Sequence, residues 1–312
     1  MAEEIAPRET YGKTLAALGH ENKDIVVLDA DLLPSTMTKY FKAEHPERFI
    51  EVGIAEANMM GIAAGLAAAG KIPFASTFAV FATGRCFDQI RVSIAQAKLN
   101  VKIVSTHAGI TVGEDGMSHQ AVEDLALMCS LAGFTVIVPA DSVETEQAVR
   151  AAAALEGPCY IRLGRSKVPV IYDESYKFEI GKASVMRKGK DATIIATGIM
   201  VAPALEAAEE LAIEGCDCRV LNMSTLKPID EAAIVEAAEE TGAIVTAEEH
   251  MEHGGLGSIV AGVVAKHRPV PMEIVALNRY AESGSPNELL KKYGLTAKDI
   301  AAATNIAIKR KP

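Results

Sequence analysis

One loop of the sequence concentrates residues that could do chemistry. Residues 106–120 contain His107 and His119, two of only seven histidines, together with Glu114, Asp115 and three glycines. The loop follows an apolar run and precedes a helical pattern, and loops of this composition commonly carry binding residues. The two histidines stand twelve residues apart with no third ligand at helical spacing, which argues against a metal site. We therefore expect a binding loop that holds no metal.

A glutamate lies in an unusually apolar stretch. Residues 49–58 have the pattern of a strand that runs into an alanine- and glycine-rich helix, with Glu56 in the first helical turn. The helix macrodipole favours a glutamate at that position in any protein. Because its neighbours are apolar, we also expect its carboxyl group to be desolvated and able to donate or share a proton near neutral pH.

Two phenylalanines stand close together in residues 76–81. Phe78 and Phe81 are two of only eight in the chain, and they share one face if the segment is helical. Such a pair is either part of the core or a flat wall for a heterocycle.

Three further polar residues lie where strands are expected to end. Asp31 and Ser35 follow the first strand pattern, where they act either as turn and N-cap residues or as site residues. Arg165 follows the strand pattern at 159–163, and an arginine suits a bidentate phosphate contact as well as a surface salt bridge.

Short apolar runs alternate with helical patterns along the chain. The expected strands are 25–28, 72–75, 101–105, 135–138 and 159–163, then 193–196, 218–221, 243–246 and 272–275. The clearest helical patterns between them are 55–69, 84–97, 121–131 and 143–155. This alternation predicts an α/β fold of two doubly wound domains, each with a parallel sheet covered on both faces, and a small-molecule site at the carboxyl ends of the strands.

A polar stretch interrupts the alternation and marks the expected domain boundary. We place the first domain at residues 1–175, a linker at 176–190 and a smaller second domain at 191–312. The second domain contains Glu248, Glu249, His250 and His253, which could suggest a metal site. A strand-end turn before a glycine-rich helix start is the favoured interpretation, because no third ligand is apparent.

Composition narrows the class of protein. The 312 residues are 49% hydrophobic, which suffices for two domains with real cores. The net charge of −10 is spread without runs, which argues against nucleic acid or anionic membranes as partners. The N-terminus has neither a basic nor an apolar leader pattern, so we expect a cytoplasmic protein whose five cysteines are reduced packing residues.

Four segments together resemble the transketolase family. They are the Asp-Leu-x-Pro-Ser turn, the Gly-Ile-x-Glu junction, Ser-Thr-Phe-x-x-Phe, and Thr-His followed by Gly-Glu-Asp-Gly-x-x-His-Gln, at 31–35, 53–56, 76–81 and 106–120. Each segment is a weak signal, yet their joint order and spacing are specific. The resemblance covers the pyrimidine-binding and C-terminal domains and is typical of the C-terminal section of a split, two-subunit transketolase.

The resemblance implies roles for individual residues. Glu56 matches the glutamate that hydrogen-bonds the aminopyrimidine ring of thiamine diphosphate and so activates this cofactor, and Asp31 matches a carboxylate near the thiazolium ring. Phe78 and Phe81 match the aromatic wall of the pyrimidine site.

A second group of residues corresponds to the substrate channel. His107 and His119 match catalytic and donor-channel residues, and Asp115 lines the same channel. Ser35 and Arg165 match groups at the sugar-phosphate end.

The family also implies a partner. Its Gly-Asp-Gly then Asn motif for the diphosphate and the Mg2+ or Ca2+ ion is absent from this sequence. We therefore expect a partner subunit that carries the diphosphate-binding domain, an α2β2 assembly, self-association through both domains of this chain, and an apolar or glycine- and alanine-rich surface around 53–69.

The expected activity is transfer of a two-carbon ketol unit from a ketose phosphate of the xylulose 5-phosphate type to an aldose phosphate. Gly84, Met117 and the Ala108–Gly109 pair depart from common family residues, which leaves the substrate preference open. Alternatives are a subunit like deoxyxylulose 5-phosphate synthase or the pyruvate dehydrogenase β chain, and a non-catalytic scaffold subunit.

Overall fold

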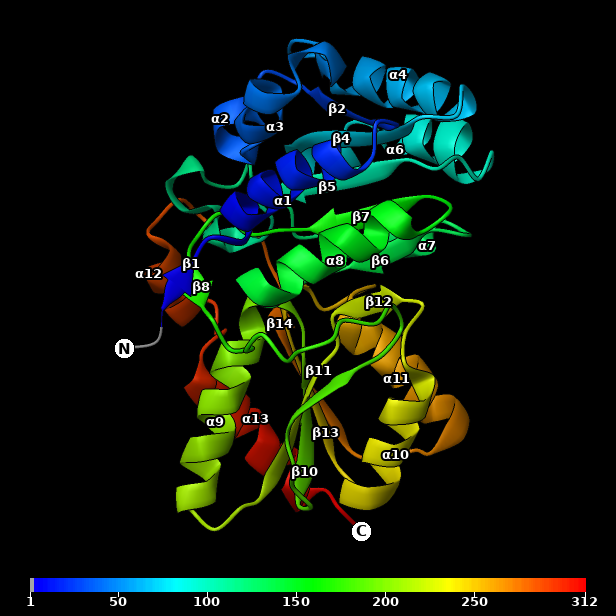
Figure 1. Ribbon diagram of the computed structural model, residues 1–312. Helices are drawn as coiled ribbons and strands as arrows, with labels where there is room; N and C mark the ends of the chain where they lie inside the picture. Colours follow the sequence, from blue (N-terminus) through cyan, green and yellow to red (C-terminus); the bar gives the residue numbers. More distant parts are fainter. Residues whose placement is uncertain (1–2) are drawn as a thin grey trace.

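The computed structural model describes residues 3–312. Residues 1 and 2, which belong to the N-terminal segment considered above for a leader pattern, lie outside the described residues. The chain forms two α/β domains, one above the other in Figure 1. The larger sheet has the order β12-β6-β7-β5-β4-β2-β3. Its strands are β12 (Thr225–Lys227), β6 (Thr135–Ile137), β7 (Cys159–Arg162), β5 (Lys102–Thr106), β4 (Ile72–Phe78), β2 (Ile25–Asp29) and β3 (Phe49–Glu51). All pairs are parallel except β12 with β6.

Helices cover both faces of this sheet because successive strand residues point to opposite sides. On one face Tyr11, Phe41 and Val149 form a buried cluster with strand residues such as Val27 and Phe74. The helices on this face are α1 (Pro7–Glu21), α3 (Lys39–Glu44) and α8 (Ser142–Ala154). The other face carries α4 (Glu56–Ala68), α7 (Asp124–Ser130) and the π-helix η2 (Ile90–Ala95). Short elements complete the domain: α2 (Leu33–Thr36), η1 (Pro46–Arg48), α5 (Ala79–Thr83), α6 (Phe87–Gln89) and η3 (Ile110–Asp115).

The second domain is built around a five-stranded sheet of order β14-β13-β10-β11-β9. Its strands are β14 (Met272–Leu277), β13 (Ile244–Met251), β10 (Ala192–Ala196), β11 (Cys218–Asn222) and the antiparallel β9 (Ser184–Arg187). Figure 1 shows α9 (Val201–Ile213) and α13 (Ala297–Lys309) on one side and α10 (Glu231–Thr241) and α11 (Leu256–His267) on the other. The remaining elements are η4 (Gly198–Met200), α12 (Pro286–Lys292) and a small sheet of β1 (Glu4–Ile5) with β8 (Val168–Pro169). The predicted α/β fold with two doubly wound domains is confirmed.

The two domains are joined by more than the connecting segment. Strand β12 leaves the second domain and pairs with β6 at the edge of the first sheet. One buried cluster runs through both domains, because Val136 and Val138 pack in the same core as Leu221, Met223 and Leu226. A rigid junction between the domains follows from this shared core.

Local structure differs from the sequence expectations at four places. Glu248, Glu249 and His250, expected in a turn after a strand at 243–246, lie within the longer strand β13. The helix expected over 84–97 is a short α6 followed by the π-helix η2, and β9 forms within the segment 176–190 that we expected to be a linker. Phe78 ends β4 while Phe81 lies in α5, so the two do not share one helix. The domain boundaries themselves stay a prediction.

A buried polar contact at the domain junction gives a first test. Asn222 of β11 donates through Nδ2 to both carboxyl oxygens of Glu144 in α8, at 3.0 and 2.9 Å, and burial raises the pKa of Glu144. Asn222→Leu removes these donors and leaves carboxyl oxygens under-satisfied, so the free energy of unfolding is expected to fall by about 2 kcal/mol in urea titrations. The exposed Asn278→Leu is the control, and an equal small effect of both changes contradicts the assignment.

Candidate active site

A buried carboxyl group stands at the start of α4. Glu56 is 3% exposed and is the first residue of that helix, where the macrodipole favours a negative charge. Arg85 donates through Nη1 to Glu56 Oε2 at 2.7 Å, and its guanidinium lies 4.5 Å from the centre of the Phe81 ring. The arginine therefore joins the carboxylate to the aromatic wall.

Two phenylalanines and two histidines pack beside this carboxyl group. The rings of Phe78 and Phe81 are stacked, with 5.7 Å between centroids and 14° between planes. His107 stacks on Phe78 at 3.8 Å, and His119 meets the Phe81 ring edge-on at 5.3 Å. The junction between β4 and α5 and the loop after β5 thus meet, although they are separate segments of the sequence.

His107 is held in an unusual backbone conformation. Its φ is +61°, its side chain is buried, and its Nδ1 lies 2.8 Å from Thr106 Oγ1. Burial lowers the pKa of His107 to about 3, with smaller contributions from Arg8 and Arg165. The imidazole is therefore neutral at physiological pH and offers one donor and one acceptor.

Two arginines, Arg8 and Arg165, lie together next to the predicted substrate loop. Arg8 donates to the carbonyl oxygens of Ser35 and Arg165, at 2.8 and 3.2 Å. Arg165 donates to Val112 O at 2.6 Å and lies 3.6 Å from the Asp115 carboxylate. Burial, with the neighbouring Arg165 charge, lowers the pKa of Arg8. The Arg165 guanidinium also lies 3.5 Å from the Glu114 carboxylate, so carboxylates of the loop already face this arginine.

The predicted carboxylate Asp31 lies apart from this cluster. It is exposed, its φ is +61°, and its backbone amide donates to Glu51 Oε1 at 2.8 Å. The buried carboxylate of the turn is Asp29, which accepts from Thr36 and Thr38 and whose pKa burial raises to about 6. Asp29 therefore holds the turn that carries Asp31.

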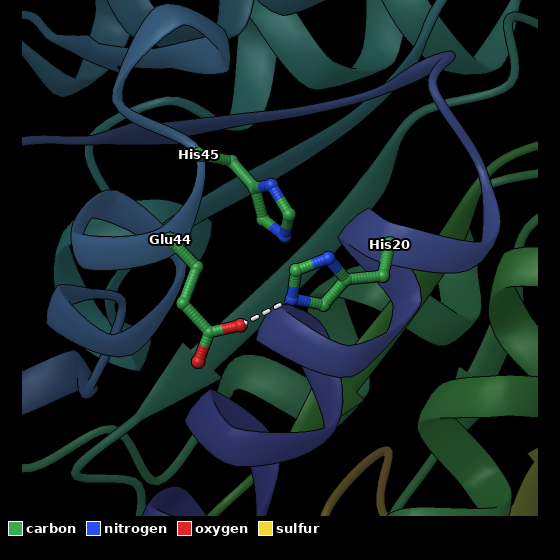
Figure 2. Close-up of side chains that lie close together, drawn as sticks. All are labelled: His20, Glu44 and His45. Atoms are coloured by element: carbon green, nitrogen blue, oxygen red, sulfur yellow. Dashed lines mark hydrogen bonds and ion pairs between the residues drawn. The ribbon is translucent and has the colours of Figure 1, made fainter.

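A cluster with possible metal ligands lies elsewhere. Figure 2 shows His20, Glu44 and His45 close together, with His20 and Glu44 exposed and His45 buried. His20 pairs with Glu44, but both ring nitrogens of His45 are engaged, Nε2 with Ala16 O at 3.0 Å and Nδ1 with Arg48 Nη2 at 2.8 Å. His45 has no free nitrogen for a metal, so the cluster is a surface contact.

Two family models together cover most of the chain. The transketolase pyrimidine binding domain matches residues 3–170, and the transketolase C-terminal domain matches residues 181–300. The chain belongs to the transketolase family. The resemblance inferred from the four motifs is confirmed.

Some relatives of this transketolase chain are matched over almost their whole length, whereas in others the chain matches about half of a longer protein. A Methanocaldococcus jannaschii protein named for a transketolase C-terminal section is 47% identical, covering 94% of this chain and 93% of the relative. The 6-deoxy-6-sulfo-D-fructose transketolase subunit of Clostridium sp. is 46% identical, covering 97% and 95%. Human transketolase is 43% identical over 97% of this chain and 49% of its own length.

Solved structures give the same assignment. A split-gene transketolase, solved as an inactive β4 tetramer, is 55% identical with a TM-score of 0.93, covering 99% of this chain and all of that one. Transketolase from Leishmania mexicana is 26% identical with a TM-score of 0.85, covering 100% and 47%. The chain therefore corresponds in sequence and fold to the C-terminal section of a transketolase.

The family implies thiamine diphosphate and a divalent metal, and the residues fit one end of that cofactor. A buried carboxyl group beside two stacked rings suits a flat heterocycle with a ring nitrogen to be hydrogen-bonded. Among residues 3–312, the side chains whose ligand atoms lie close enough together to hold a metal ion are His20, Glu44 and His45. The fit is thus to the pyrimidine, which Glu56, Phe78 and Phe81 would hold.

The outer face of α4 is unusually bare. Ile54, just before the helix, is 78% exposed, and a Cβ atom built on Gly61 or Gly65 would meet nothing within 4 Å. Exposed small and apolar residues of this kind are typical of a surface that another chain covers. No helix among the described residues combines the length and hydrophobicity needed to cross a bilayer.

Sequence reasoning missed two residues of the candidate site. Arg85 stands four residues after Phe81, a spacing that indicates contact on a helix and could have been used. Arg8 gave no such signal, because its partner Arg165 is 157 residues away.

The low pKa of His107 gives a direct test. Since the folded value is about 3 and the unfolded value about 6.5, the native ring is expected to stay neutral from pH 8 to pH 5. The unfolded ring takes up a proton below about pH 6.5, so the free energy of unfolding is expected to fall as the pH drops from about 6.5 towards 3. Nitrogen chemical shifts of labelled histidine measure the state of the ring. The urea-unfolded chain is the control, and an imidazolium signal from His107 above pH 5 in the native state refutes the prediction.

Proposed function

We propose that this chain is the C-terminal subunit of a thiamine-diphosphate-dependent transketolase that moves a two-carbon ketol unit from a ketose phosphate to an aldose phosphate. The observation that carries the proposal is the buried Glu56 carboxyl group beside the stacked rings of Phe78 and Phe81. Membership of the transketolase family and the match to split-gene relatives support it.

Glu56 and its neighbours hold the pyrimidine end of the cofactor. When bound, the cofactor supplies the carbanion-stabilising chemistry that ketol transfer needs. Glu56 hydrogen-bonds the ring nitrogen and holds the proton there, while the phenylalanines fix the plane of the ring. In the chain alone Arg85 pairs with Glu56, which offsets the cost of a buried charge, so a ring nitrogen must compete with this contact.

The two histidines and the two arginines bind the sugar substrate. Neutral His107, with His119 and Asp115, offers donors and acceptors to the hydroxyl groups of the donor ketose. Arg8 and Arg165, next to Ser35, bind the terminal anion. One relative is named for a sulfonated sugar. The assay therefore compares donor sugars that end in a phosphate group with donor sugars that end in a sulfonate group.

A partner subunit supplies the rest of the site. We propose that it carries the diphosphate-binding domain and most ligands of the Mg2+ or Ca2+ ion, and that the two chains form a cytoplasmic α2β2 assembly. The bare face of α4 supports a covered surface there. A related split-gene transketolase is inactive as a β4 tetramer, which agrees with the need for a second kind of chain.

The deciding experiment is co-expression with a transketolase N-terminal subunit. Ketol transfer from xylulose 5-phosphate, or from its sulfonated counterpart, to ribose 5-phosphate is the expected result. Turnover of pyruvate with an aldehyde instead would replace the proposal with a decarboxylating activity, and turnover by this chain alone would remove the partner.

Loss of the Glu56 carboxyl group is expected to remove turnover. In the assembled enzyme, Glu56→Gln should lower kcat by a factor of about 100 to 10,000, since proton transfer at the ring nitrogen is lost. Steady-state kinetics measure this effect, and circular dichroism checks the fold. The control is Glu47→Gln at an exposed carboxylate, and a near-normal rate for Glu56→Gln excludes the residue from the mechanism.

Loss of Arg8 is expected to weaken binding of the terminal anion. Arg8→Ala should raise KM for a phosphorylated donor about 10- to 100-fold, because a charged hydrogen bond contributes about 1.5 to 3 kcal/mol. KM for a donor without phosphate should change less than threefold. Arg150→Ala, at a partly exposed arginine on α8, is the control. Equal effects of Arg8→Ala on both donors would argue against an anion site.

A further inference from the structure

The glycines of the predicted substrate loop lie against the second domain. All three have positive φ, between 74° and 82°, and they are Gly109, Gly113 and Gly116. A Cβ atom on Gly109 would come within 2.1 Å of the Glu249 carboxyl group, and one on Gly116 would lie 3.2 Å from Ser283 Cβ. Absent side chains therefore let the loop approach the C-terminal domain closely.

Hydrogen bonds fasten the same loop from the second domain. Glu249 Oε1 accepts from the Thr111 amide at 2.6 Å, a contact between residues 138 apart in the sequence. Ser283 Oγ donates to Glu114 O at 2.5 Å. The loop that carries His107 and His119 is thus clamped by the other domain.

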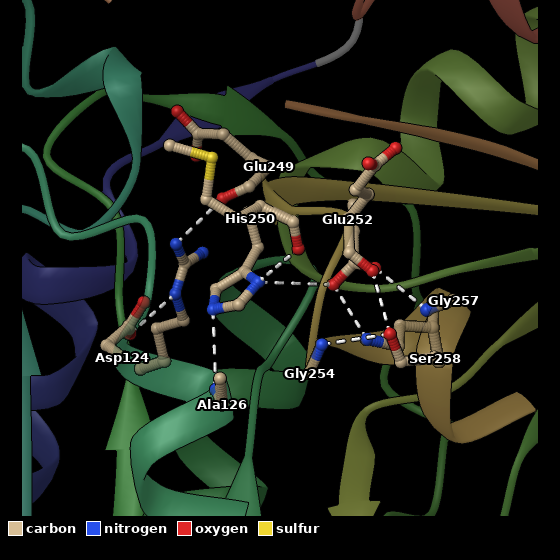
Figure 3. Close-up of polar contacts among 12 residues, drawn as sticks. Asp124, Ala126, Glu249, His250, Glu252, Gly254, Gly257 and Ser258 are labelled. Carbon is tan, nitrogen blue, oxygen red and sulfur yellow. Dashed lines mark hydrogen bonds and ion pairs between the residues drawn. The ribbon is translucent and has the colours of Figure 1, made fainter. Parts of the chain in front are cut away.

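Glu249 is itself held firmly. It lies in β13 and is fully buried, and Arg162 donates to its carbonyl oxygen at 2.9 Å while pairing with Asp124 at 2.8 Å. Figure 3 shows Asp124, Glu249 and His250 converging at the junction of the domains. Burial raises the pKa of Glu249 to about 7, partly opposed by the Arg162 charge, and Glu249 Oε2 is buried without a partner. The carboxyl group serves at this position as an acceptor for the Thr111 amide.

The neighbouring Glu248 provides an internal comparison. It is buried in the same strand, and burial raises its pKa to about 7 as well. Its oxygens accept from the amides of Leu256 and Gly257, at 2.7 and 2.8 Å, at the start of α11. The two acids therefore have the same chemistry, but Glu248 supports only its own domain.

We propose that Glu249 is a positioning residue of the active site, through which the C-terminal domain fixes the loop carrying His107 and His119 and so sets the affinity for the sugar substrate. The link to substrate rests on the function proposed above. The clamp itself does not depend on that function, because it rests on the contact between Glu249 and the Thr111 amide and on the bond from Ser283 to the Glu114 carbonyl oxygen. The second domain then does more than mediate association.

Hydrogen–deuterium exchange of the isolated chain tests the clamp without any activity. Glu249→Met keeps the side-chain volume but cannot accept the Thr111 amide, so amides 110–117 are expected to exchange at least tenfold faster. Glu248→Met should instead speed exchange at 255–258 and leave 110–117 unchanged. Equal protection of 110–117 in the Glu249→Met variant and the native chain overturns the proposal.

Activity of the assembled enzyme tests the consequence for substrate. Glu249→Met is expected to raise KM for the donor sugar at least tenfold, with kcat and the affinity for thiamine diphosphate within threefold. Glu249→Gln should stay within threefold, because its amide oxygen still accepts the Thr111 amide, and Glu248→Met should leave KM unchanged. A fall in kcat at constant KM, or no rescue by glutamine, overturns the positioning role.

Two outcomes need separate interpretation. If Glu249→Met does not fold, Ser283→Ala at an exposed position removes the second tie and should speed exchange at 114–116 about threefold; unchanged exchange there overturns the clamp. An enzyme that transfers no ketol unit in its native form refutes the proposed function, whereas the exchange experiment still decides whether the clamp exists.

Discussion

The ion pair of Arg162 and Asp124 is the contact on which the arrangement of the site depends. Arg162 ends the β7 strand, is buried, and reaches Asp124 at the start of α7 with a distance of 2.8 Å. The same guanidinium donates to the carbonyl oxygens of Ala121, at the end of the substrate loop, and Glu249, in the other domain. A buried charge is costly unless its partners are all in place. Sheet, helix, loop and second domain therefore have one mutually compatible arrangement.

The fold was largely predictable because its information is local. Short apolar runs rich in β-branched residues indicate the strands, and the helical patterns between them indicate the helices that cover the sheets. These patterns predicted nine of the strands near their observed places. Glu56 could be singled out for the same reason, since its apolar neighbours adjoin it in the sequence. The pairing of β12 with β6 was not predictable, because a three-residue strand has little pattern and its partner lies in another domain.

Site residues that act across long sequence separations escaped prediction. Arg165 was expected from the sequence, but Arg8 reaches it only through the folded chain, and Glu249 meets Thr111 in the same way. The Glu248–His253 segment was expected to be a strand-end turn, but β13 continues through Glu248, Glu249 and His250 to Met251. Nothing in its composition indicated that one of two adjacent acids faces a loop of the other domain. The glycines of the predicted substrate loop stood out in the sequence as part of a binding loop, and their surroundings show that they also allow close contact with the second domain.

Strand β12 has a consequence for the solubility of the chain. It covers β6, so among the described strands of the large sheet the edge strands are β12 and β3, each only three residues long. Uncovered edges recruit strands from other molecules and begin aggregation. Because the covering strand belongs to the second domain, partial opening of that domain uncovers a sticky edge on the first. The solubility of the first domain therefore depends on how firmly the second domain is docked.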